Sequence, residues 1–203
     1  MTRAEFAARL KNACAAVTAA EAELTEIDSK FGDADHGLTM AKIAGAISEA
    51  VDAAEGGIQS MLDDAAMAVM TLNGGSAVPL WNTWLDGLQE EAPEGNEIDT
   101  AGIQAIFAKA LKALSDMSGA KVGDKTMMDA LIPASEAVAA YTGDSADELF
   151  DAAAQAAAQG AEATNQYVSK FGRAKSYGEQ TIGTPDAGAV SMACFFQGLA
   201  KAD

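Results

Sequence analysis

The chain has 203 residues, of which 49% are apolar and 6% aromatic, and its 13 basic and 30 acidic residues give a formal net charge of −17. This length fits one domain with a sizeable core, so we expect a single unit over residues 1–203. The large negative charge disfavours nucleic acid and anionic membrane as partners. The chain also lacks a run of about 18 apolar residues that could span a bilayer.

Composition also indicates a fold class and a compartment. Abundant alanine with few aromatic residues favours closely packed helices over a sheet. Cys14 and Cys194 stand apart in apolar helical patterns without the spacing of a zinc site, which is typical of reduced core cysteines. The N-terminal residues are charged and amphipathic, without the apolar run of a signal peptide. We therefore expect a cytoplasmic helical protein.

The first predicted element is a helix over residues 2–27, whose apolar residues recur at alternating spacings of four and three. It ends at a short loop that holds Asp28, Asp33, Asp35 and the only histidine, His36. Carboxylates held this close repel one another unless a cation relieves them. Oxygen ligands favour a hard cation, Mg²⁺ or Ca²⁺.

The same loop resembles the start of an EF-hand, but only in its first positions. An EF-hand needs glycine at the sixth position and a bidentate glutamate at the twelfth. Here Gly37 falls fifth and Ala44 holds the twelfth position, so the EF-hand is excluded. Mg²⁺ takes one or two carboxylates and completes its shell with water and phosphates. The loop therefore fits one or two Mg²⁺ under a nucleotide, and a solvated acidic loop without a ligand is the alternative.

Helices are also predicted over residues 39–53, 58–72 and 80–88. A glycine-rich turn that contains Gly75, Ser76 and Ala77 precedes the last of these and leads into Pro79, a residue favoured in a first helical turn. Backbone N–H groups and the positive dipole end at such a helix start can bind an anion. Most such turns only connect helices, so this signal is weak alone.

The second half of the chain predicts four more helices: over residues 100–118, from a cap at residue 124, over 145–169, and from about 185 to 200. The stretch from Gly119 to Thr126 superficially suggests a P-loop. Asp124 stands where the second glycine belongs and a helix precedes the stretch, so the P-loop is excluded. We expect Asp124 to cap the sixth helix and Lys125 to lie near an anion.

A long glycine-bearing loop over residues 171–188 carries Arg173 and Lys175, two of the few cations. The four unusual loops follow predicted helices one, three, five and seven, and such loops share one end of an up-and-down bundle. The sequence therefore predicts an all-α, eight-helix antiparallel bundle with these loops on one rim. Carboxylates, an anion-binding helix start and a few cations fit a nucleotide polyphosphate with Mg²⁺ and phosphoryl transfer.

Three longer motifs lie within these loops: Gly-Asp-Ala-Asp-His-Gly-Leu-Thr-Met at 32–40, Gly-Asp-Lys-Thr-Met at 123–127, and Gly-Arg-Ala…Tyr-Gly-Glu…Ile-Gly…Pro-Asp-Ala-Gly-Ala at 172–189. With them, nearly the whole chain resembles the L, nucleotide-binding, subunit of dihydroxyacetone kinases. The resemblance implies a closed antiparallel barrel of eight helices with ADP or ATP and two Mg²⁺ at one rim. It also implies a separate K subunit that holds the ketose covalently through a histidine. In some members a phosphotransferase-system subunit rephosphorylates bound ADP.

The resemblance further implies roles for individual residues. Asp28, Asp33 and Asp35 match the Mg²⁺ ligands, and we place His36 and Arg173 as the catalytic candidates. With Gly75 and Lys125 added from the loop chemistry above, the expected nucleotide contacts are His36, Gly37, Leu38, Thr39, Gly75, Ser76, Ala77, Gly119, Lys125, Met127, Arg173, Asp186, Ala187 and Gly188.

The chain departs from the family pattern in two loops. Val78 replaces a frequent glycine and the neighbouring serine lies one place early, which predicts a reshaped phosphate turn. Lys175 and its neighbours also differ from the usual last loop. Two other functions therefore stay open: a non-catalytic regulatory or adaptor bundle that binds ADP and Mg²⁺, and a kinase subunit for another sugar such as a four-carbon ketose. The ketose and the phosphoryl source also stay open.

Overall fold

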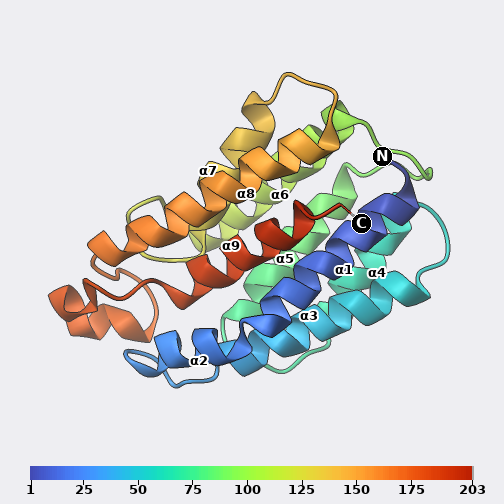
Figure 1. Cartoon of the computed structure of the whole chain (residues 1–203). Coiled ribbons are helices and arrows are strands. Elements are labelled where there is room, and N and C mark those ends of the chain that lie inside the picture. Colours follow the sequence, from blue (N-terminus) through green and yellow to red (C-terminus); the bar gives the residue numbers. More distant parts are fainter. Residues whose placement is uncertain (203) are drawn as a thin grey trace.

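The computed structural model describes residues 1–202, and the regular structure in that range is helical (Figure 1). A single β-type contact in this range, an isolated antiparallel bridge, joins Thr2 to Glu97. None of the helices in this range is long and apolar enough to cross a membrane. The helices are α1 Arg3–Ala19, α2 Glu21–Ser29, α3 His36–Ala53, α4 Ile58–Met70, α5 Ala77–Glu90, α6 Thr100–Ser118, α7 Met128–Ala140, α8 Ala146–Ala163, the 3-10 helices η1 Thr164–Gln166 and η2 Arg173–Thr181, and α9 Ala187–Leu199.

Eight of the helices close into a ring. α1 packs on α3, each later α-helix packs on the next along the chain, and α9 returns to α1. The shorter α2 lies across one end and packs on α3 and α9 (Figure 1). The predicted all-α, eight-helix closed barrel is therefore confirmed.

Aromatic side chains fill the inside of this ring. Trp84 is fully buried, and its ring packs against four others at centroid distances of 5.4 to 6.4 Å. These neighbours are Trp81, Phe107, Phe195 and Phe196. Rings of this size remove much apolar surface from water, so the cluster is a main source of the fold's stability.

The ring closes where the backbones of α1 and α9 come together. A Cβ atom at Gly198 would lie 2.3 Å from the Cα of Ala13 and 2.5 Å from the carbonyl oxygen of Asn12. Only glycine allows this approach, because any side chain at this position would meet backbone atoms that cannot rotate away.

The first predicted helix is wrong in one respect, because it is two helices. Ala20 leaves the helical conformation at φ −87° and ψ 1°, and α2 then runs across α3. α2 and α3 touch at Gly37, where a Cβ would lie 2.1 Å from the carbonyl oxygen of Glu21. α3 begins at His36, three residues earlier than predicted, so His36 and Gly37 form its first turn.

The sixth and seventh predicted helices also need correction. α7 begins at Met128, so Asp124 does not cap it. Asp124 instead accepts a hydrogen bond from the Lys170 ammonium at 2.7 Å, because the loop before α7 packs against the loop after α8. α8 ends at Ala163 rather than 169, and the last loop contains the unpredicted 3-10 helix η2.

Candidate functional site

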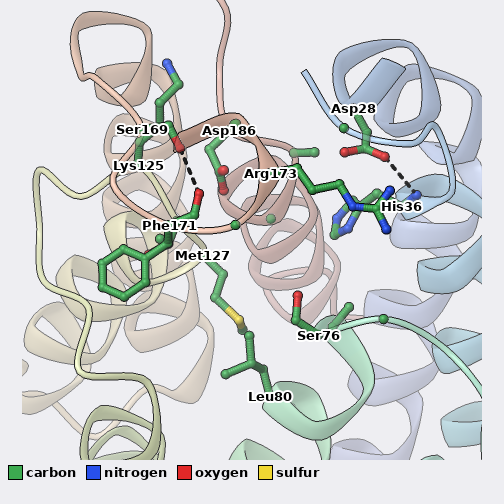
Figure 2. Close-up of a pocket in the computed structure, with 18 of the residues that line it drawn as sticks. Asp28, His36, Ser76, Leu80, Lys125, Met127, Ser169, Phe171, Arg173 and Asp186 are labelled. Atoms are coloured by element: carbon green, nitrogen blue, oxygen red, sulfur yellow. Dashed lines mark hydrogen bonds between the residues drawn. The ribbon is translucent and has the colours of Figure 1, made fainter. Parts of the chain in front are cut away.

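A cavity of about 610 Å³ opens at the end of the ring where the loops after α2, α4, α6 and α8 meet. This volume lies in the range of small-molecule sites. All four loops contribute lining residues, so the convergence inferred from helix alternation is present in the structure. Charged and polar groups, among them Arg173, Asp28 and His36, line one side of the cavity, and apolar groups line the other (Figure 2).

Three carboxylates gather on the charged side. One oxygen from each of Asp28, Asp33 and Asp35 lies within 4.8 Å of the other two. The loop is turned back on itself by the Asp28 carboxylate, which accepts the backbone N–H groups of Asp35 at 3.1 Å and His36 at 3.4 Å. Burial and the negative charges of Asp33 and Asp28 raise the pKa of Asp35. A hard divalent cation would relieve this repulsion, so the donor set fits Mg²⁺.

The segment around η2 is fastened to the same loop by two contacts. Arg173 forms an ion pair with Asp33, and the rings of Phe31 and Tyr177 pack with centroids 5.2 Å apart. The Arg173 side chain is still 67% exposed, so its guanidinium is accessible beside the carboxylates. An anionic group that entered the cavity would meet this cation on the charged side.

His36 lies on the same side and is half-buried. Its Nε2 is 3.2 Å from the hydroxyl of Ser191, which itself donates to the carbonyl of Gly188 at 2.9 Å. Burial lowers the pKa of His36, and the charge of Asp28 opposes that shift. Ser191 was not predicted, because a serine in the apolar pattern of α9 gives no sign of its partner on α3.

The other side of the cavity is an apolar wall. Leu80, Met127 and Phe171 line it from α5, the loop before α7 and the loop after α8 (Figure 2). A flat, mostly apolar group of a ligand would fit this wall. Of these residues the sequence indicated only Met127, because Leu80 follows the core pattern of its helix and Phe171 lies at the start of a mostly polar loop.

The start of α9 brings a half-buried carboxylate to the cavity. Asp186 caps the helix by accepting the backbone N–H of Ala189 at 2.8 Å. Burial raises the pKa of Asp186 to about 7, the carboxylate of Asp129 adds to this rise, and the Lys125 ammonium opposes it. The group therefore carries a partial proton near neutral pH.

Most of the predicted contact residues line this cavity: Asp28, Asp33, Asp35, His36, Thr39, Gly75, Ser76, Ala77, Lys125, Met127, Arg173, Asp186, Ala187 and Gly188. Gly37, Leu38 and Gly119 do not. Gly37 faces α2, half of Leu38 is exposed to solvent, and Gly119 ends α6 in a left-handed conformation. Lys125 borders the cavity, but its ammonium is directed to backbone carbonyl groups rather than to an open anion site.

Known proteins are similar to this chain in sequence and in fold. The family model described as the DAK2 domain matches residues 30–201. D-erythrulose kinase of Mycolicibacterium smegmatis is 38% identical over 196 residues, which cover 94% of this chain and 34% of that protein. The ADP-binding subunit of PEP-dependent dihydroxyacetone kinase 2 of Listeria innocua is 30% identical over 173 residues, which cover 83% of this chain and 80% of that subunit.

A solved structure confirms the fold. The dihydroxyacetone kinase from C. freundii, in complex with AMP-PNP and Mg²⁺, has a TM-score of 0.75 at 24% identity. The match covers 97% of this chain and 33% of that one. The chain therefore spans about a third of the length of the erythrulose kinase and of this structural relative.

Proposed function

The chain belongs to the DAK2 domain family, and we propose that it is the nucleotide-binding, phosphoryl-donating part of a short-ketose kinase. The observation that carries this proposal is the division of one cavity into a carboxylate cluster with an arginine and an apolar wall. A magnesium nucleotide has the matching division, with charged phosphates at one end and a flat base at the other.

The charged side would hold the phosphates and the metal. Asp28, Asp33 and Asp35 would bind one or two Mg²⁺, which when bound would offset the negative charge on the phosphates. Arg173, already beside Asp33, would donate hydrogen bonds to phosphate oxygens. Residues at the starts of α3, α5 and α9 line the same space, and their unused backbone N–H groups would add uncharged donors.

The apolar side would hold the base. Met127, Leu80 and Phe171 offer an apolar surface at a distance from the carboxylates that keeps the two ends of a nucleotide apart (Figure 2). His36, which burial keeps largely uncharged, would act as a neutral hydrogen-bonding group beside the phosphates rather than as a second cation. The reshaped turn at Val78 stays a prediction; what supports it is that the Val78 side chain crowds Gly74, where an added Cβ would lie 2.6 Å from it.

The ketose would be carried by another subunit or domain. The chain covers 34% of the erythrulose kinase, so a protein of that kind has room for a separate ketose-binding domain outside the matched part. We propose a K-type partner that holds the ketose and receives the phosphoryl group at the open mouth of the cavity. The higher identity to an erythrulose kinase, 38% against 30% for the ADP-binding subunit, favours a four-carbon ketose. For the phosphoryl source we propose exchangeable ATP.

A calorimetric titration tests the nucleotide proposal. We expect the wild-type chain to bind one ADP in the presence of Mg²⁺ and much less tightly after chelation of the metal. Asp33→Asn should weaken Mg-ADP binding by roughly tenfold or more, because it removes a charged ligand and the partner of Arg173. Asp63→Asn is the matched control, since Asp63 is exposed on α4 away from the cavity. A folded wild-type chain that binds no Mg-nucleotide would refute the proposal.

A transfer assay tests the substrate and the donor. The chain is mixed with a K-type subunit, dihydroxyacetone or erythrulose, and either ATP or a PEP-driven phosphotransferase system. Phosphorylation of erythrulose with ATP is expected. Tight ADP binding without transfer to any ketose would instead indicate a regulatory or adaptor protein.

A further inference from the structure

The side chain of Lys125 enters the base of the long loop between α8 and α9. Only 4% of the residue is exposed. Its ammonium lies within hydrogen-bond distance of four backbone carbonyl oxygens, those of Thr164, Tyr167, Thr181 and Thr184, at 2.7, 3.1, 2.8 and 2.6 Å, so two of them share a proton. An ammonium has three protons, so these contacts use its whole donor capacity. None is left for a ligand while the contacts persist.

The four carbonyl groups fall into two pairs on either side of one loop. Thr164 and Tyr167 precede the segment that carries Arg173, and Thr181 and Thr184 follow it. A single cation therefore ties the two ends of the loop together. Closing a loop at its base removes conformational freedom from everything between the ends, so Lys125 restricts where Arg173 can lie.

The local backbone shows that this inward direction of Lys125 is imposed by its surroundings. Lys125 has a φ of +61°, a left-handed conformation that residues other than glycine rarely adopt. The buried Asp129 carboxylate holds the turn on both sides, accepting the N–H of Gly123 at 2.6 Å and of Thr126 at 2.7 Å. Such strain persists where the neighbouring structure over-determines it, as a functional loop requires.

We propose that Lys125 is a positioning residue that does not touch the nucleotide but clamps the 164–184 loop, and thereby holds Arg173 beside the carboxylate cluster. The inference rests on the proposed nucleotide function and adds to it a role for a buried cation. The alternative is that Lys125 contacts a phosphate directly.

A double-mutant cycle on Mg-ADP binding distinguishes the two roles. Lys125→Met should weaken binding by roughly tenfold to a hundredfold, the loss expected when Arg173 no longer makes its charge-assisted hydrogen bond to a phosphate. Lys121→Met, which removes an exposed lysine of the same loop, is the matched control and should leave the affinity unchanged. In an Arg173→Ala background, removal of Lys125 should cost less than about a further twofold, because the clamp acts through Arg173.

Chemical rescue provides a second readout that a general loss of stability would not give. In Lys125→Ala, propylammonium has the length and the charge of the missing side-chain end. It should restore Mg-ADP affinity and the hydrogen-exchange protection of residues 164–184, whereas tetramethylammonium, which has no N–H donor, should not.

Each result then decides the question. Additive losses from Lys125→Met and Arg173→Ala, or wild-type affinity in Lys125→Met, would overturn the clamp while leaving the nucleotide proposal intact. Absence of Mg-ADP binding by the wild-type chain would instead refute the nucleotide proposal itself. If Lys125→Met and Lys125→Ala fail to fold, the latter even with propylammonium, then Lys125 is needed for the stability of the whole fold rather than for the position of the loop. The inference is then also overturned.

Discussion

The half-buried carboxylate of Asp186 makes the free energy of unfolding depend on pH in the direction opposite to that of a salt-bridged acid. Its pKa rises from 3.8 in the unfolded chain to about 7 in the folded protein, so the folded state binds more protons in this interval. The free energy of unfolding should therefore fall as pH rises from about 4 to about 7. Asp186→Asn removes the titrating group, so the fall in the free energy of unfolding over this pH range should be smaller by about a few kcal/mol. Urea denaturation at several pH values measures the difference.

The matched control for this prediction is Asp63→Asn, which removes a carboxylate of the same type from an exposed helix face. It should leave the pH dependence nearly parallel to that of the wild type. If Asp186→Asn also ran parallel to the wild type, the half-buried carboxylate would titrate normally and the raised pKa would be contradicted.

Single polar residues near the cavity were the hardest to predict from sequence. The loop pattern identified Asp28, Asp33, Asp35 and Arg173 as neighbours, because alternation of helices alone brings their loops to one end. The direction of the Lys125 side chain could not be predicted in this way. It depends on carbonyl groups of the loop after α8, which lie 39 to 56 residues further along the chain.

At the scale of helices, the contact between α1 and α9 decides whether the ring closes. Gly198→Ala would place a methyl group 2.3 Å from the Cα of Ala13, and overpacking of this kind costs about 1–3 kcal/mol. Gly45→Ala on α3 is the matched control, because a Cβ there meets nothing within 4 Å. It should stabilise the protein by about 0.5–1 kcal/mol, the preference of a helix interior for alanine over glycine.

Chemical denaturation measures the free energy of unfolding of both variants, which should be lower than that of the wild type for Gly198→Ala and higher for Gly45→Ala. Equal stability of Gly198→Ala and the wild type would mean that α1 and α9 can separate without loss, which contradicts the closed ring. Destabilisation by Gly45→Ala would show that the outer face of α3 is more crowded than the structure indicates.

The helices themselves were largely predictable, and the errors have identifiable causes. The apolar repeat located α6 at Thr100–Ser118 as predicted, because most of its stripe between Ile103 and Leu114 is buried. The break at Ala20 was missed because alanine favours helix and the turn is made by packing of α2 on Gly37. The helix η2 was missed because its sequence is polar and interrupted by Gly178, whose φ is 55°.

For the whole molecule, the net charge of −17 predicts a strong response to salt. Like charges on a compact barrel repel one another, and salt shortens the range of that repulsion. The melting temperature at about pH 7.5 should therefore rise by several degrees between about 0.02 and 0.5 M NaCl. Near the sequence isoelectric point of about 4.2 the rise should largely vanish. A melting temperature that is equally insensitive to salt at both pH values would contradict this expectation.

Trp81 connects the interior of the barrel to the cavity. It lines the cavity, and its ring meets Trp84 at a centroid distance of 5.6 Å and an interplanar angle of 82°. These are the two indoles of the chain. Tryptophan fluorescence and the tryptophan bands of the near-ultraviolet circular dichroism spectrum therefore come from one pair of adjacent indoles, one of which lines the binding space, so an unlabelled sample carries its own optical reporter of occupancy.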